Sequence, residues 1–126
     1  MKKFELTENY KMFSGRKLFQ IRALVSIKDV VEAGELGGYI EKEENLSQFD
    51  NSWVSENACV FGNARVVGNS RVTENACVSG NAFVAGNSRV TENARVSGNA
   101  FVAGNSCVSG NKHVRGDALV LGDDIL

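Results

Sequence analysis

Few side chains in this chain of 126 residues could support acid–base, thiol or metal chemistry. There is one histidine, His113. The cysteines are Cys59, Cys77 and Cys107, and the glutamates Glu56, Glu74 and Glu92 recur at intervals of 18 residues. A histidine can act as a general base, cysteines as metal ligands, and a row of carboxylates as a cation site. Each role needs partners at a fixed distance, so the elements that position these residues decide whether chemistry follows.

Those elements are set by a repeat of six residues. Valine occurs at every sixth position from Val54 to Val120 without a gap. Ala or Ser stands two positions before each valine except at Lys112, and Asn, once replaced by Asp117, precedes that small residue. Side chains alternate along an extended chain, so the small residue and the valine point inward. Gly-Asn or Glu-Asn then turns the corner, because Gly and Asn tolerate positive φ.

Three such units make one triangular coil of 18 residues, and stacked coils bury the valines. The predicted fold is therefore all-β: a parallel β-helix of about four coils over residues 51–122. Residues 1–50 are expected to form a small N-terminal β cap, with strands at 17–25 and 38–41, and residues 123–126 a C-terminal tail. A separate binding module in residues 1–50 is the alternative.

The units NARV, NAFVAG and NSRVTE resemble those of hexapeptide-repeat proteins, whose fold is the left-handed parallel β-helix. Residues 30–54, VVEAGELGGYIEKEENLSQFDNSWV, and LFQIRALVSIKD just upstream resemble the YdcK-like bacterial and bacteriophage proteins. The left hand is taken from this resemblance, since the general crossover rule favours right-handed connections. Members of that group are labelled acyltransferases on fold analogy, and many are carried by phages or prophages.

The 18-residue register assigns the outward side chains to three faces. The first face carries Trp53, Ser55, Arg71, Thr73, Arg89, Thr91, Cys107 and Ser109. The second face carries Cys59, Phe61, Cys77, Ser79, Arg95, Ser97, His113 and Arg115. The third face carries Arg65, Val67, Phe83, Ala85, Phe101, Ala103, Leu119 and Leu121.

Only the third face is mostly apolar, and a soluble monomer seldom exposes a flat apolar strip of roughly 300 Å². We therefore predict an interface there, most simply with a second copy of the chain. Its residues are Val67, Phe83, Ala85, Phe101, Ala103, Leu119 and Leu121. The alternative is that the N-terminal segment covers the strip.

The three glutamates 56, 74 and 92 replace glycine at equivalent corners and form an acidic edge. Like charges in such a column repel, so we expect compensation. Arg71 and Arg89 on the adjoining face could pair with them in solvent, and a site for a cation or a basic partner is the alternative. Cys59 and Cys77 should be neighbours with free thiols, because stacked positions are slightly wide for a relaxed disulfide.

The charge balance limits the classes of partner. The chain has 14 Lys+Arg against 15 Asp+Glu, which argues against a nucleic-acid surface. No run approaches the roughly 18 apolar residues of a membrane span, and MKKFELTENY lacks a signal-peptide core. An odd cysteine count without CxxC spacing favours a reducing compartment. We expect a cytoplasmic protein with no nucleic-acid partner, no membrane partner, no metal and no cofactor.

The resemblance raises acyl transfer as a possible activity, since hexapeptide acyltransferases use a histidine base near a loop that leaves the coil. His113 lies in an uninterrupted run of repeats with no acidic partner in its column, so we assign no catalytic residue. The expected function is a non-catalytic solenoid that acts by protein–protein contact, with a phage-encoded inhibitor of a host defence protein as one form of it. A degenerate acyltransferase is the alternative.

Overall fold

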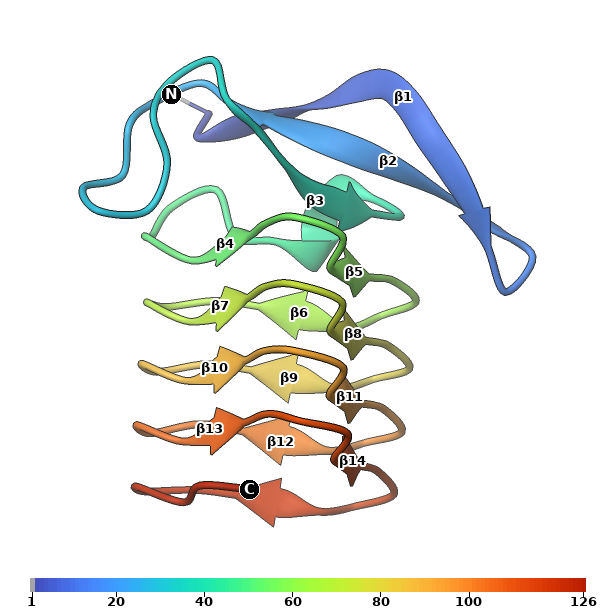
Figure 1. The fold of residues 1–126 in the computed structure, drawn as a ribbon, viewed down its shortest axis with the longest axis vertical. Helices are drawn as coiled ribbons and strands as arrows, with labels where there is room; N and C mark the ends of the chain where they lie inside the picture. The colour runs from blue at the N-terminus through green and yellow to red at the C-terminus, as the bar shows by residue number, and fades with distance from the viewer. Residues whose placement is uncertain (1) are drawn as a thin grey trace.

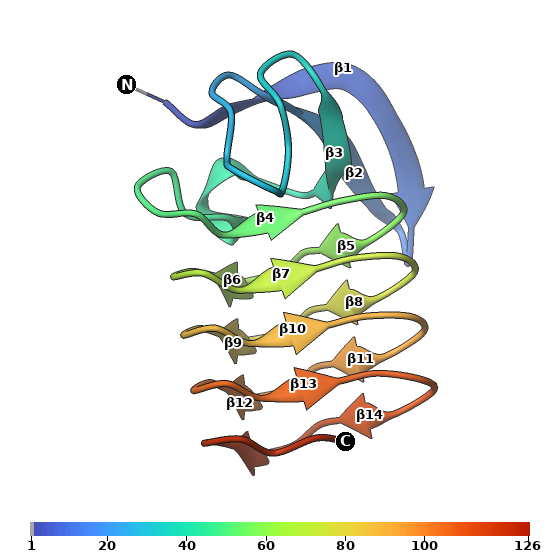
Figure 2. The same ribbon diagram turned by 60° about the vertical axis from the view of Figure 1, so that its left-hand side comes forward.

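The computed structural model describes residues 2–126, which form a triangular β-solenoid with a β-hairpin over its N-terminal end (Figure 1). The solenoid is a left-handed parallel β-helix of about five turns, which confirms the predicted fold class. Strands of two residues alternate with corners, and each face is a stack of parallel strands (Figure 2). No helix among residues 2–126 has the length and apolar character that crossing a membrane requires.

Three parallel stacks form the faces. The first face contains β4 (Trp53–Val54), β7 (Arg71–Val72), β10 (Arg89–Val90) and β13 (Cys107–Val108). The second face contains β5 (Cys59–Val60), β8 (Cys77–Val78), β11 (Arg95–Val96) and β14 (His113–Val114). The third face contains β6 (Arg65–Val66), β9 (Phe83–Val84), β12 (Phe101–Val102) and β15 (Leu119–Val120).

The strand register confirms the predicted columns. Phe83 pairs with Phe101 and Val84 with Val102, each 18 residues apart. All twelve repeat valines are buried, at 0% to 5% exposure. A core of branched valines and corner alanines therefore runs the length of the solenoid.

The corners satisfy their polar groups in two ways. Serine occupies the corner between the third and first faces. The hydroxyls of Ser70, Ser88 and Ser106 donate to the carbonyl three residues back, as Ser88 does to Ala85 at 2.7 Å. Asparagine side chains form ladders, each amide nitrogen donating to the side-chain oxygen one rung further along. One ladder runs from Asn63 through Asn81 and Asn99 to Asp117, with distances of 3.2, 3.1 and 3.2 Å.

The N-terminal segment forms three strands and a 3₁₀ turn: β1 (Phe4–Phe13), β2 (Arg16–Ala23), β3 (Leu36–Ile40) and η1 (Glu43–Asn45). β2 and β3 match the two expected strands, whereas β1 was not expected. β1 and β2 form an antiparallel hairpin, and β2 pairs antiparallel with β3. β3 pairs parallel with β5 and so belongs to the second face.

The parallel backbone pairing of the three faces extends beyond residues 51–122 at both ends. Leu46 bridges Val66 on the third face, and Ile125 bridges Cys107 on the first. The backbone of Leu126 also donates to Cys107, at 2.8 Å. The cap and the tail thus each contribute part of a rung, which is why the solenoid has more turns than the repeats alone supply.

One residue that was assigned to the outer surface of the first face is buried. Trp53 occupies the predicted outward position but is only 1% exposed, because the N-terminal segment covers it. Phe4 packs edge-to-face against its indole, with ring centroids 6.5 Å apart. The cap therefore seals part of the first face as well as the end of the core.

Candidate functional site

The third face gathers the seven residues that the sequence predicted as an interface. Phe83 and Phe101 stack with ring centroids 5.2 Å apart and an interplanar angle of 6°. Both rings are half-buried by one another, while Leu119 and Leu121 further along are 65% and 47% exposed. The two outward positions of each rung form separate columns, because the first begins the two-residue strand and the second follows it, two residues further along the extended chain.

The N-terminal end of this face holds an aromatic ring that sequence reasoning missed. Phe49 is 96% exposed and lines a cavity of about 390 Å³ together with Leu46, Arg65 and Val67. Phe49 lies outside the hexad repeat, so no register placed it. Its one sequence signal is a bulky apolar residue between polar neighbours in a loop.

The alternative prediction is that the N-terminal segment covers the third face. The position of that segment in the structure bears directly on this alternative. The β1–β2 hairpin extends beside the second face (Figure 1). Its Phe13 packs edge-to-face on Phe61, with ring centroids 5.6 Å apart. Within residues 2–50, the segment 43–49 reaches the third face, at its first rung. Among residues 2–126, no strand pairs with or packs over the rungs of β9, β12 and β15 from outside.

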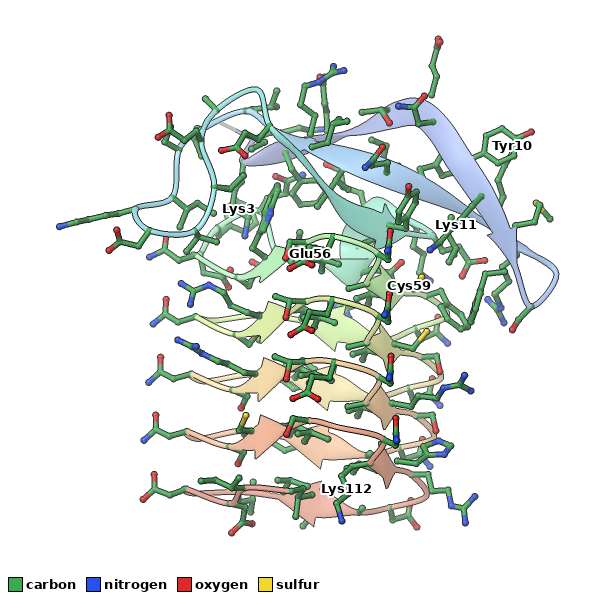
Figure 3. All side chains as sticks on the ribbon, in the orientation of Figure 1. Lys3, Tyr10, Lys11, Glu56, Cys59 and Lys112 are labelled. Atoms are coloured by element: carbon green, nitrogen blue, oxygen red, sulfur yellow. The ribbon has the colours of Figure 1, made fainter. Side chains whose placement is uncertain are left out.

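The acidic edge lies at the corner between the first and second faces, where Figure 3 labels Glu56 at its N-terminal end. All three glutamates adopt left-handed backbone conformations, with φ of 58° to 60°. The expected pairing with Arg71 and Arg89 does not occur within 4.0 Å, since the ion pairs among the described residues all involve residues 2–50. Within the same residues, no three His, Cys, Asp or Glu side chains group closely enough to hold a metal ion.

Cys59 and Cys77 are cross-strand neighbours on the second face, and both thiols are free. Cys59 is buried beside Lys11 of β1 (Figure 3). The hydrogen bond from Cys77 and the Lys11 ammonium lower the pKa of Cys59 to about 7, although burial opposes this shift. The same contact and burial raise the pKa of Cys77.

His113 is exposed on the second face, as the register predicted. Its Nε2 lies 3.0 Å from Ser97 Oγ, the side-chain contact that orients the ring. No carboxylate among residues 2–126 bonds its other nitrogen, although general-base chemistry needs such an orienting partner.

One charged side chain is buried where the cap meets the first coil. Lys3 is 4% exposed, and its Nζ donates to the Ser52 carbonyl at 2.6 Å and to Asp50 at 3.4 Å. Burial lowers the pKa of Lys3 to about 8, and Asp50 only partly offsets this. Hydrogen bonds from Ser52 and Gly68 hold the pKa of Asp50 below its usual value despite its own desolvation.

Comparison with known proteins supports this description. No family model matches the chain. It is 39% identical over 82 residues to a protein of Escherichia coli (strain K12) named "Uncharacterized acetyltransferase YdcK", and the match covers 58% of this chain. The matched part is 25% of the relative, so the chain spans about a quarter of the length of the protein it matches. The expected resemblance is thus confirmed: the chain is a left-handed β-helix of hexapeptide repeats that is similar to YdcK.

Proposed function

We propose that the protein is a non-catalytic binding solenoid whose third face docks a second copy of the same chain. The observation that carries this proposal is the flat apolar column of Phe83 and Phe101, continued by the exposed Leu119 and Leu121. Apolar strips of this kind mark contact surfaces on soluble proteins. The regular backbone beneath the strip keeps its shape constant from rung to rung.

The shape of the third face is complementary to the third face of a second copy of the chain. One column carries the large side chains Phe83 and Phe101, and the other carries Ala85 and Ala103 in the same rungs. A two-fold axis parallel to the solenoid, between two facing copies, brings each large column opposite the small column of the partner at the same level. The rings then fill the space above the alanines. A two-fold axis along the strands would instead oppose ring to ring and leave gaps between alanines.

The size of the strip sets the expected affinity. The area of roughly 300 Å² per copy is well below the ~800 Å² per partner of a standard interface. We therefore expect a dimer whose population depends on protein concentration, with dissociation in the micromolar range or weaker. Phe49 and the cavity beside Val67 add contact area at the N-terminal end of the face.

Sedimentation velocity over a range of concentrations tests this function. The wild type should shift from monomer to dimer, and Phe83→Asp with Phe101→Asp should remain monomeric. Arg89→Asp on the first face is the matched control and should behave as wild type. Ala85→Trp distinguishes shape complementarity from general stickiness, because it adds apolar area but blocks the position opposite the partner's ring. A dimer that persists in the double Asp variant would rule out the third face.

Binding to a host protein also stays a prediction. One form of it is a phage-encoded chain that inhibits a host defence protein. No contact among the described residues selects such a partner. Affinity purification from the native host with the wild type and with the double Asp variant, followed by mass spectrometry, tests it. A specific partner should be retained by the wild type and lost from the variant if the third face binds it.

Acyl transfer is the second candidate function, and the name of the similar E. coli protein favours it. His113 would be the base that takes the proton from an acceptor, with Ser97 orienting its ring. Incubation with acetyl-CoA and a primary amine or alcohol as acceptor tests this candidate by the melting temperature and by release of the CoA thiol as the acetyl group passes to the acceptor. Both signals should appear in the wild type, whereas His113→Gln should lose the thiol release and keep the melting-temperature shift, because the base acts in transfer and not in binding. A flat melting temperature together with background thiol release would remove the candidate.

A further inference from the structure

A groove on the second face lies beneath the tip of the β1–β2 hairpin. Its volume is about 290 Å³. The hairpin contributes Phe13 and Ser14, and the solenoid contributes Phe61, Cys77, Ser79, Arg95, Ser97 and His113. The hairpin projects sideways from the N-terminal end and overhangs this face (Figure 1). The groove therefore runs along several rungs, with a roof at its N-terminal end only.

The roofed end of the groove is aromatic. Phe13 meets Phe61 edge-to-face at 5.6 Å between ring centroids. The Arg16 guanidinium lies 5.6 Å from the Phe61 ring centroid but donates to Glu41 at 2.8 Å, so its charge is balanced. This end consequently offers aromatic surface without a free charge, which suits a flat apolar group.

The open end of the groove is basic. Arg95 and His113 line it, and none of its eight lining residues is a carboxylate. Arg95 makes no ion pair with any of residues 2–126, because the ion pairs there belong to other arginines and lysines. The neighbouring hydroxyls of Ser79 and Ser97 add donors, and Ser97 already holds the His113 ring at 3.0 Å. A guanidinium beside an imidazole and hydroxyls is a donor set for a carboxylate or a phosphate.

We propose that this groove binds a small organic anion, with its apolar ring against Phe13 and Phe61 and its charged group at Arg95 and His113. The volume is at the low end of small-molecule sites, which limits the ligand to one or two rings. The first face carries Arg89 at the equivalent outward position without a hairpin above it, so a basic side chain alone does not produce this groove. The combination of roof and unpaired cation is specific to the second face.

Isothermal titration of the full chain with four probes tests the proposal. Phenyl phosphate and benzoate carry both a ring and an anionic group, whereas inorganic phosphate lacks the ring and benzyl alcohol lacks the charge. Phenyl phosphate or benzoate, the two complete probes, should bind about tenfold more tightly than either half-probe, inorganic phosphate or benzyl alcohol. The tighter of the two identifies the charged group as phosphate or carboxylate. Half-probes that bind as tightly as both complete probes would overturn the proposal.

Variants locate the binding in the groove. Arg95→Gln and Phe13→Ala should each weaken the tighter probe about five- to tenfold, with circular dichroism confirming that both variants are folded. Arg89→Gln is the matched control on the first face and should bind as wild type. Wild-type affinity in both Arg95→Gln and Phe13→Ala would overturn the site. The double Asp variant of the third face should also bind normally, so this result stands apart from the proposed dimer.

Discussion

In residues 51–122 each rung repeats the contacts of the rung before it, whereas residues 2–50 bury side chains whose environments occur only once. The repeat divides its core among twelve equivalent valines. The N-terminal segment instead depends on single contacts, such as Phe4 against Trp53 of the first rung and the buried Lys3. Stability is therefore distributed along the solenoid and concentrated at its junction with the cap. Substitutions in the two regions should differ accordingly.

The largest expected effect is at the junction. Trp53→Ala removes a ring that is 1% exposed and should cost about 3–5 kcal/mol of unfolding free energy. Arg89→Ala, two rungs away in the same column, should change it by no more than about 0.5 kcal/mol. Urea denaturation followed by circular dichroism measures both, since the substitution removes the chain's one tryptophan. Equal effects would show that the cap does not seal the first rung.

The second largest effect is expected from alanine substitutions at the corner glycines, which test how tightly the rungs stack. Gly86 has φ of +70°, and a Cβ there would lie 2.7 Å from the Gly104 carbonyl oxygen. Gly86→Ala should cost about 2–3 kcal/mol, from the left-handed backbone and the clash together. Gly110→Ala, at φ of +64° with no heavy atom within 4 Å, should cost about 1 kcal/mol. Chemical denaturation of both variants checks this, and an equal loss would mean that the rungs separate easily.

The third effect concerns pH and the buried lysine. Burial lowers the pKa of Lys3 in the folded protein to about 8, from the ordinary lysine value of 10.5. Between these values the unfolded chain binds more protons, so the unfolding free energy should rise with pH, by at most about 1.4 kcal/mol per pH unit. Lys3→Met should lack this rise.

The difference between wild type and Lys3→Met isolates the contribution of Lys3. The two cysteines contribute equally in both proteins: the lowered pKa of Cys59 favours a rise in stability above about pH 7, and the raised pKa of Cys77 favours a fall. Unfolding free energies from pH 7 to 10.5 give the difference curve. A curve that is flat would mean that Lys3 is not desolvated.

The smallest effect concerns the asparagine ladders. Asn81→Asp removes the amide that donates to Asn99 at 3.1 Å and sets two oxygens against one another. The unfolding free energy should fall by about 1 kcal/mol. Asp117→Asn is the matched control at the end of the same ladder, where the side chain only accepts, and should change stability by a few tenths. Thermal unfolding resolves the two, and identical melting temperatures would show that the ladder contributes nothing.

Periodic features were predictable because one register determines every rung. The valine repeat predicted the fold, the three faces and the stacking of Phe83 on Phe101. The strands β2 and β3 followed from alternation and turn residues. In β1 most side chains are exposed on both sides, so its alternation is weak.

Contacts that occur once were not predictable in the same way. The burial of Trp53 and the roof over the second face depend on how the hairpin folds back, and no local pattern encodes that direction. The exposed Phe49 belongs to a loop without a register. The expected pairing of the acidic edge with Arg71 and Arg89 was not found for a related reason. Arg89 and the three glutamates are exposed and can satisfy their charge in water. Arg71 is only partly exposed, and its Nε is buried without a hydrogen-bond partner.

The ladder from Asn63 to Asp117 has a direction, and its ends carry matching charges. Every amide points its N–H toward the C-terminal end, so the small dipoles add as peptide dipoles do in a helix. At the oxygen end the Lys42 ammonium donates to Asn63 at 3.0 Å, and at the N–H end the acceptor is the Asp117 carboxylate. A cation thus closes the negative pole and an anion the positive pole. The side-chain ladder therefore gives the solenoid an electrical polarity along its axis, although the described residues contain no α-helix.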